Sequence, residues 1–269
     1  MKIGVAIMVK NTEIFMKSLM SNLSWVDGIY LYDDNSSDKT VELAKKYAQT
    51  LLIVEQSTNK NPVFDRGEMI IRNYIIRTAF EKLNCDILIL IDGDELISSL
   101  LKDLILEKMS DNRYDSICFT TWHLYSENQY LHFWKTKIND VDLIDPHTRV
   151  IKKNKKFERL FNDGSHPIIN STSKTYCTNG AFHFHLKYYK LSPYPNYALH
   201  FLPERITEKD LSCYIKEIPF KLPNEIKSAL KKIDWDKYDQ LNTDYYKCYK
   251  SERKLSTSVE ENLIHPKDK

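Results

Sequence analysis

Residues 85–95 read CDILILIDGDE, an apolar run that stops abruptly at three acids and one glycine. Asp86 to Ile91 is almost entirely apolar, which is typical of a central strand of a parallel sheet, buried on both faces. The cluster Asp92-Gly93-Asp94-Glu95 follows at once, so it should lie at the carboxyl end of that strand. Ligands of open α/β sheets bind in the crevice outside these ends. The stretch therefore predicts both a fold class and the position of a site.

The rest of the chain extends this pattern. Short apolar runs alternate with amphipathic stretches over the first hundred residues, the signature of strand-helix-strand units. We expect strands at residues 3–9, 28–32 and 51–54, helices at 12–23, 38–47 and 66–83, and later short strands at 115–121, 148–152 and 180–185. The prediction is an α/β fold with a mostly parallel central sheet over residues 1–215, in halves 1–100 and 101–215. Residues 216–269 are predicted to be a helical C-terminal extension.

Composition excludes several classes of protein. The 269 residues include 39 basic and 37 acidic side chains, and this balance argues against a nucleic-acid partner. Five scattered cysteines without a C-x-x-C pair indicate neither a disulfide framework nor a zinc knuckle. The N-terminal stretch lacks the features of a signal peptide, and no apolar run approaches the roughly 18 residues that cross a bilayer. We therefore expect a cytoplasmic protein. Its basic and aromatic C-terminal segment could touch the inner membrane peripherally, although a solvated helical face is the favoured alternative.

The acids of the central strand are candidate ligands of a metal ion. Asp92 and Asp94 flank Gly93, which lets the backbone come close, and such carboxylates can bind Mg²⁺ or Mn²⁺ together with a diphosphate. A solvated turn would use the same residues. A second acidic turn, at residues 32–40, follows another predicted strand, and capping of the next helix would explain only Ser37 or Asp38. An additional aspartate there can accept hydrogen bonds from a base or a ribose.

Four motifs in order resemble the family 2 glycosyltransferases of the glycosyltransferase A fold. They are Val9-Lys10-Asn11 after the first strand, Asp33-Asp34-Asn35-Ser36-Ser37-Asp38-Lys39-Thr40 after the second, Arg72-Asn73 on a helix, and Asp92-Gly93-Asp94-Glu95. The resemblance spans roughly residues 1–100, with weaker correspondence to about 190. It implies that residues 1–100 form the nucleotide-sugar half of a catalytic domain and 101–215 the acceptor half.

The resemblance also implies roles for single residues. Asp34 would bind the nucleoside, Asp94 would coordinate Mn²⁺ or Mg²⁺, and Asp92 would contact the ribose or the metal. Lys10 and Gly93 would line the donor site. Arg72 would reach the diphosphate, with Arg66 on the same predicted helix as its rival.

The second half of the chain supplies a further metal ligand and a base by the same resemblance. Phe182-His183-Phe184-His185 offers two histidines on one face of a strand, of which we prefer His185, although such a pair is more often structural. The turn-rich stretch 162–167 contains Asp163 and His166, our candidates to face the acceptor and remove its proton. Asp145 and Glu158 are alternatives to Asp163. Inversion is expected, but the paired acids of many relatives are absent here, so retention of configuration stays open.

The implied activity is transfer of a sugar from a nucleoside-diphosphate sugar, with a UDP-sugar favoured. The acceptor would be a glycan, a lipid-linked sugar or a protein, in the biosynthesis of bacterial surface polysaccharide or lipooligosaccharide. A sugar-nucleotide nucleotidyltransferase is one alternative, but it would carry a Gly-rich loop after the first strand, where Val9-Lys10-Asn11-Thr12 has no glycine. A non-catalytic nucleotide-binding module is the other. A receiver-type module would place its acidic pair after the first strand, and here the pair follows the second.

Overall fold

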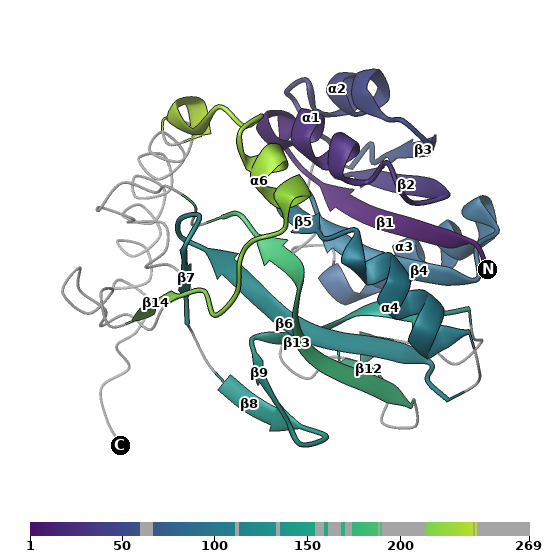
Figure 1. Cartoon of the computed structure of the whole chain (residues 1–269). Helices are drawn as coiled ribbons and strands as arrows, with labels where there is room; N and C mark the ends of the chain where they lie inside the picture. Colours follow the sequence, from purple (N-terminus) through teal and green to yellow (C-terminus); the bar gives the residue numbers. More distant parts are fainter. Residues whose placement is uncertain are drawn as a thin grey trace, which may run out of the picture. The chain divides into compact units, whose positions relative to one another are not determined.

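The computed structural model describes residues 1–59, 67–110, 113–132, 135–153, 159–160, 168–169, 174–187, 189, 214–238 and 240. The chain divides into two compact units. The first contains Met1–Tyr189 and Tyr214–Ile233, and the second contains Lys190–Cys213 and Asp234–Lys269. Of the second unit, only residues 234–238 and 240 are described. The fold that follows is that of the first unit (Figure 1).

The first unit is built around one large sheet. Its helices are α1 (Glu13–Asn22), α2 (Thr40–Tyr47), α3 (Glu68–Leu83), α4 (Leu100–Met109) and α6 (Asn224–Leu230). Its strands are β1 (Ile3–Val9), β2 (Gly28–Asp33), β3 (Leu51–Gln56), β4 (Ile87–Asp92), β5 (Glu95–Ile97), β6 (Ser116–Leu124), β7 (Gln129–Leu131), β8 (Lys135–Ile138), β9 (Val141–Ile144), β10 (Pro146–Lys152), β11 (Arg159–Leu160), β12 (Ile168–Ile169), β13 (Thr175–His185) and β14 (Ile215–Glu217).

The strand order of the large sheet is β14-β7-β6-β10-β4-β1-β2-β3, with β13 beside β6 and β5 beside β13. Strands β4, β1, β2 and β3 are parallel, and β10 joins antiparallel to β4. Strands β8 and β9 form a separate pair, as do β11 and β12. The predicted α/β fold with a mostly parallel central core is therefore confirmed.

Helices cover both faces of the parallel core, which explains its apolar sequence. In Figure 1, α3 lies behind these strands, and α1 and α4 lie in front of them. Successive side chains of a strand point to opposite faces, so the even-numbered residues of β1, β2 and β4 meet α3. The cluster between them includes Ala6, Tyr30, Tyr32, Leu88, Leu90, Ile75, Ile76, Ala79, Phe80 and Leu83. Residues 87–91 of β4 are all buried, as the run ILILI predicts.

The carboxyl ends of β1, β2 and β4 lie side by side. Val9 pairs with Asp33 and Met8 with Asp92, so the polar residues after these positions share one edge. We call it the donor edge, and define it by Lys10, Asp34, Asp92 and Asp94. The register of the parallel strands thus joins three of the sequence motifs.

Hydrogen bonds between loops fix this edge. Asn11 has a left-handed backbone (φ 50°), which asparagine tolerates better than most residues. Its N–H donates to Ser36 Oγ, and its Oδ1 accepts the N–H of Ser37, both at 2.8 Å. The loops after β1 and β2 therefore hold one another without a ligand.

Helix α2 begins at Thr40, two residues later than predicted, because Asp38 caps it from outside. Asp38 Oδ1 accepts the N–H of Thr40 at 2.9 Å, and its Oδ2 accepts the N–H of Glu13 at 3.1 Å. Glu13 Oε2 in turn accepts the N–H of Lys39 at 2.9 Å. This exchange joins the N-termini of α1 and α2, so Asp38 has a structural role beside the donor edge.

Part of the predicted C-terminal extension belongs to the first unit. Strand β14 pairs with β7, and Ser18 Oγ on α1 donates to the carbonyl oxygen of Ala229 on α6 at 2.8 Å. Residues 216–233 therefore complete the sheet unit, whereas 241–269 lie outside the described residues. Within the described ranges, no helix is long and apolar enough to span a membrane.

Candidate functional site

Asp34 forms the first part of the donor edge. Its side chain is almost fully buried, and Lys10 Nζ lies 3.3 Å from its Oδ2. Its N–H donates to the carbonyl oxygen of Val9 at 2.8 Å, which fixes its place beside β1. Two residues that the sequence assigns to donor binding, Lys10 and Asp34, are therefore in contact.

Asp33 points away from this edge into the protein. Its Oδ2 accepts the N–H of Ser36 at 3.2 Å and a hydrogen bond from Gln56 Nε2 at 3.3 Å, and the side chain is fully buried. Asp33 therefore shapes the turn, which leaves Asp34 as the aspartate of the pair that lies on Lys10.

Asp92, at the end of β4, is held by Arg72 of α3. Arg72 Nη1 and Nη2 lie 2.8 and 3.3 Å from the two carboxylate oxygens of Asp92, and Arg72 Nε donates to Glu68 Oε1 at 2.6 Å. Burial alone would lower the pKa of Arg72, but the two carboxylates raise it. The sequence predicts that Arg72 reaches a diphosphate. In the structure its guanidinium forms a two-pronged ion pair that orients Asp92.

Gly93 lets the end of β4 pack against the end of β1. A Cβ atom at Gly93 would lie 2.9 Å from Thr12 Oγ1 and 3.0 Å from Val9 Cγ1, closer than such atoms normally approach. The N–H of Gly93 donates to the carbonyl oxygen of Met8 at 3.1 Å. Packing within the protein therefore favours glycine at this position. The sequence suggests a second reason, the close approach of a ligand to the backbone.

Asp94 and His185 meet at the donor edge, although they are 91 residues apart in sequence. His185 Nε2 lies 3.2 Å from Asp94 Oδ2, and both side chains are partly exposed. Burial alone would raise the pKa of Asp94 and lower that of His185. Their mutual attraction lowers the pKa of Asp94 and raises that of His185.

This pair fits a divalent ion. Neighbouring ligands of an octahedral ion with bonds of about 2.1 Å lie about 3 Å apart, close to the separation of these two atoms. No group of three or more histidine, cysteine or acidic side chains that could hold a metal ion occurs within the described part of the chain. Both oxygens of Asp92, the other predicted ligand, face Arg72.

Glu95, the last acid of the cluster, is buried behind the edge. Arg149 Nη2 on β10 lies 2.6 Å from Glu95 Oε1, and the N–H of Asp92 donates to Oε2 at 2.8 Å. His183 Nε2 lies 3.1 Å from Oε2, an ion-pair distance without hydrogen-bond geometry. Its Nδ1 is 3.1 Å from Thr121 Oγ1, and the ring is fully buried. His183 therefore supports Glu95 from inside, while His185 reaches the edge.

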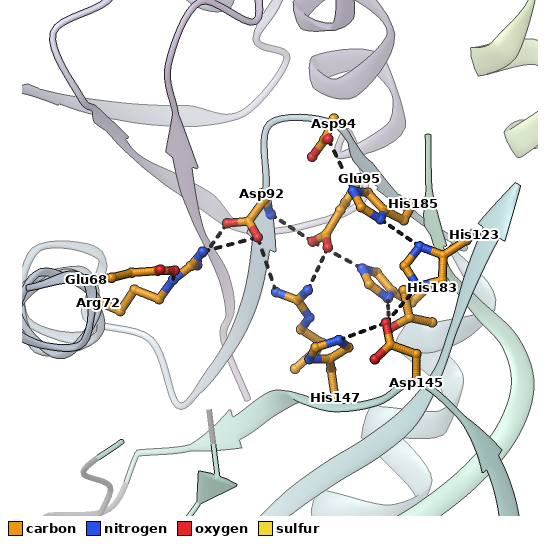
Figure 2. A network of polar contacts seen from close by, with 12 residues as sticks. Glu68, Arg72, Asp92, Asp94, Glu95, His123, Asp145, His147, His183 and His185 are labelled. Atoms are coloured by element: carbon orange, nitrogen blue, oxygen red, sulfur yellow. Dashed lines mark hydrogen bonds and ion pairs between the residues drawn. The ribbon is translucent and has the colours of Figure 1, made fainter. Parts of the chain in front are cut away.

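Behind His185 lies a row of hydrogen-bonded side chains that no sequence motif predicts as a group. His185 Nδ1 lies 2.8 Å from Nδ1 of His123, and His123 Nε2 lies 2.6 Å from Asp145 Oδ2 (Figure 2). His147 Nε2 is 3.3 Å from the same oxygen. Asp145, an alternative base in the sequence analysis, is thus buried against two histidines. No local pattern marks His123 or Arg149, because each lies within a strand and meets a partner distant in sequence. His147 lies two residues from its partner Asp145, but no motif pointed to it.

Lys187 is a further residue that sequence reasoning missed. Burial lowers the pKa of Lys187 to about 8, although the nearby carboxylates of Asp94 and Asp92 act in the opposite direction. It adds a basic group to the acidic edge. Four predicted or alternative residues, Arg66, Glu158, Asp163 and His166, lie outside the described residues, and their roles stay predictions.

The chain resembles several solved structures at low identity. A structure of TarS from S. aureus, residues 1–349, has 16% identity and a TM-score of 0.46 over 70% of this chain and 61% of that one. The same protein in complex with UDP-GlcNAc has 15% identity and a TM-score of 0.45 over 71% and 59%. Glucosyl-3-phosphoglycerate synthase from Mycobacterium tuberculosis, in complex with Mn²⁺, UDP and glucosyl-3-phosphoglycerate, has 17% identity and a TM-score of 0.33 over 46% and 44%. The chain thus spans less than two thirds of each.

Family membership rests on the sequence of the domain itself. No curated protein sequence matches the chain significantly. The model of the family described as "Glycosyl transferase family 2" matches residues 13–174, more than half of the 269 residues. This range includes the acidic turn after β2, Arg72 and the acids after β4. The chain belongs to glycosyl transferase family 2, and the predicted glycosyltransferase A fold agrees with its parallel core.

Proposed function

We propose that this chain transfers a sugar from a nucleoside-diphosphate sugar, with a UDP-sugar favoured, to a hydroxyl group of a glycan, a lipid-linked sugar or a protein. One observation carries the proposal. The Asp34–Lys10 pair follows β2 and β1, and the Asp94–His185 pair joins the loop after β4 to the last residue of β13. Both pairs lie at the carboxyl ends of the parallel strands β1, β2 and β4. The first pair suits the nucleoside and the second suits the diphosphate of a nucleoside diphosphate.

The nucleoside would bind at Asp34. A carboxylate accepts hydrogen bonds from the N–H of a pyrimidine or from ribose hydroxyl groups. Lys10 lies on the same carboxylate and keeps this almost buried acid paired in the absence of a donor. Asp92, oriented by Arg72, is the second candidate acceptor for the ribose.

The diphosphate would bind at Asp94 and His185, which would hold Mn²⁺ or Mg²⁺. Such an ion neutralises the charge of the departing nucleoside diphosphate. Lys187, close to both aspartates, adds a positive charge for the same phosphates. Arg72 and Arg149 instead pair with Asp92 and Glu95, so the positive charges behind the edge hold the acidic cluster in place.

The acceptor step needs a base. We assign it to Asp163, with His166 beside the acceptor, because the sequence 162–167 is rich in polar and turn-forming residues and follows the donor half. The base would remove the proton of the acceptor hydroxyl as that oxygen attacks the anomeric carbon. Attack from the face opposite the leaving group inverts the configuration.

A donor panel tests the proposal. The purified chain is incubated with UDP-, GDP- and CDP-sugars, with Mn²⁺ or with a chelator, and release of the nucleoside diphosphate is measured. We expect one donor to be hydrolysed slowly with metal and not with chelator, and we expect Asp94→Ala to reduce the rate on the order of 10³-fold.

The matched control is Asp103→Ala, which removes an exposed aspartate of α4 and should leave the rate unchanged. Binding of no donor in either condition would overturn the proposal. Release of pyrophosphate from a nucleoside triphosphate and a sugar phosphate would identify a nucleotidyltransferase instead.

A further inference from the structure

We infer that Asp145 and His123 are positioning residues that keep Nε2 of His185 directed at Asp94 and available to a divalent cation. This inference rests on the proposed function. It concerns two residues that lie well behind the donor edge, in β6 and at the junction of β9 and β10, and that the family motifs do not include.

The contacts form a single row. Strands β6 and β13 are paired with His123 opposite His185, which brings the two rings to an Nδ1–Nδ1 distance of 2.8 Å. The other nitrogen of His123 lies 2.6 Å from the Asp145 carboxylate. The other nitrogen of His185 lies 3.2 Å from Asp94. Figure 2 shows the row from Asp145 through both rings to Asp94.

Hydrogen-bond chemistry gives the row a direction. A carboxylate only accepts, so Nε2 of His123 carries a hydrogen atom. A neutral ring has one donor and one acceptor nitrogen, so Nδ1 of His123 accepts. Nδ1 of His185 must then donate, and the lone pair of a neutral His185 is left on Nε2, which faces Asp94. Histidine ligands of metals are commonly oriented in this way by a carboxylate or another acceptor on the second nitrogen.

The start of the row is anchored. Asp145 has a left-handed backbone (φ 40°), a conformation that is unfavourable for an aspartate. It is 6% exposed, its carboxylate also lies 3.3 Å from His147 Nε2, and its carbonyl oxygen accepts the N–H of Thr121 at 3.4 Å. This conformation is held by the strands on either side, and it aims the carboxylate at His123.

The test measures metal affinity and the position of the hydrogen atoms. Binding of Mn²⁺ in the presence of UDP is followed by electron paramagnetic resonance for the wild-type chain, Asp145→Asn and His123→Asn. The amide of Asp145→Asn can donate to His123 Nε2 and reverse the row, so we expect the affinity for Mn²⁺ to fall about 10- to 100-fold. His123→Asn retains an oxygen near the former position of Nδ1, so its affinity for Mn²⁺ should fall less than that of Asp145→Asn.

A second readout excludes a purely structural role. In the Mg²⁺–UDP complex, ¹⁵N NMR should place a hydrogen atom on Nδ1 of His185 and on Nε2 of His123. The control His132→Gln alters a histidine just after β7 whose ring contacts Tyr130, and should leave both readouts unchanged.

The outcomes separate this inference from the proposed function. Wild-type binding that depends on Asp94, with an unchanged affinity in Asp145→Asn or with the hydrogen atom of His185 on Nε2, overturns the positioning role alone. Absence of Mn²⁺ binding in the wild-type chain with UDP overturns both. Loss of affinity in Asp145→Asn with an unchanged melting temperature and a relocated hydrogen atom supports the inference.

Discussion

The donor edge and the polar network behind it use the same residue types for opposite purposes. At the edge, acids and a lysine follow the last residues of β1, β2 and β4, and the side chains of Asp92 and Asp94 are 27% and 26% exposed. In the network, the side chains come from β5, β6, β10 and β13 and from Asp145 at the junction of β9 and β10. His123, His147, Arg149 and His183 are at most 8% exposed. A group at the end of a strand can meet a ligand, whereas one within a strand must meet its partner inside the protein.

The acids and the arginine buried behind the donor edge are tolerated because they are paired. Each of these buried acids has a partner: Glu95 forms an ion pair with Arg149, and Asp145 accepts a hydrogen bond from His123. An unpaired buried charge is costly. Removing the partner of a buried charge in the network, such as Arg149, should therefore act mainly on stability, and substitutions at the donor edge mainly on the proposed donor binding.

The largest effect is expected for Arg149→Met. It leaves Glu95, which is 3% exposed, without its guanidinium partner, and breaking a buried ion pair costs about 3–5 kcal/mol. The free energy of unfolding in urea should fall by that amount. Adding Glu95→Gln should restore part of it, because the uncompensated charge is gone.

The control for this substitution is Arg77→Met, which removes an exposed arginine of α3 and should change the free energy of unfolding by less than about 0.5 kcal/mol. Equal stability of Arg149→Met and Arg77→Met would show that the network does not stabilise the fold.

A smaller effect, on binding, is expected for Asp34→Asn. The side chain keeps its shape but loses the charge that pairs with Lys10 and that, in the proposed function, accepts from the nucleoside. Hydrogen bonds to charged groups contribute about 1.5–3 kcal/mol, so the Kd of the donor should rise roughly 10- to 100-fold in a calorimetric titration. Asp86→Asn makes the same change just before β4, at the opposite edge, and should leave the Kd unaltered. Similar losses in both variants would remove Asp34 from the donor site.

The smallest effect concerns the pH dependence of stability at His147. Burial, together with the charge of Arg149, lowers the pKa of His147 from 6.5 to about 4, although Asp145 and Glu95 act in the opposite direction. The unfolded chain therefore takes up this proton first, and stability is lost as the pH falls from about 6.5 towards 4.

His147→Gln removes that contribution. Between pH 7 and pH 5, the wild-type chain should lose about 1–2 kcal/mol more of its free energy of unfolding than His147→Gln does. Urea unfolding at both pH values measures the difference. Parallel curves for the two proteins would show that His147 is not held neutral by its surroundings.

Local sequence patterns predicted the parallel half of the fold well. The strand predicted at 3–9 is β1, and the predictions for β2, β3 and β4 are off by at most two residues at either end. Each of these elements is defined by its own apolar run and its own turn. The predictions for the later strands are less accurate. Strand β13, for example, begins five residues before the predicted 180–185, because its first half is polar and is held by pairing with β6.

The sequence by itself determined the edge. Lys10, Asp34, Asp92 and Asp94 each follow an apolar strand, and parallel strands necessarily bring their carboxyl ends together. Only the tertiary structure decided what lies behind them. Arg149 meets Glu95 across 54 residues, His123 meets His185 across 62, and His185 meets Asp94 across 91. These contacts depend on which strands pair and in which register, and no short stretch of sequence contains that information.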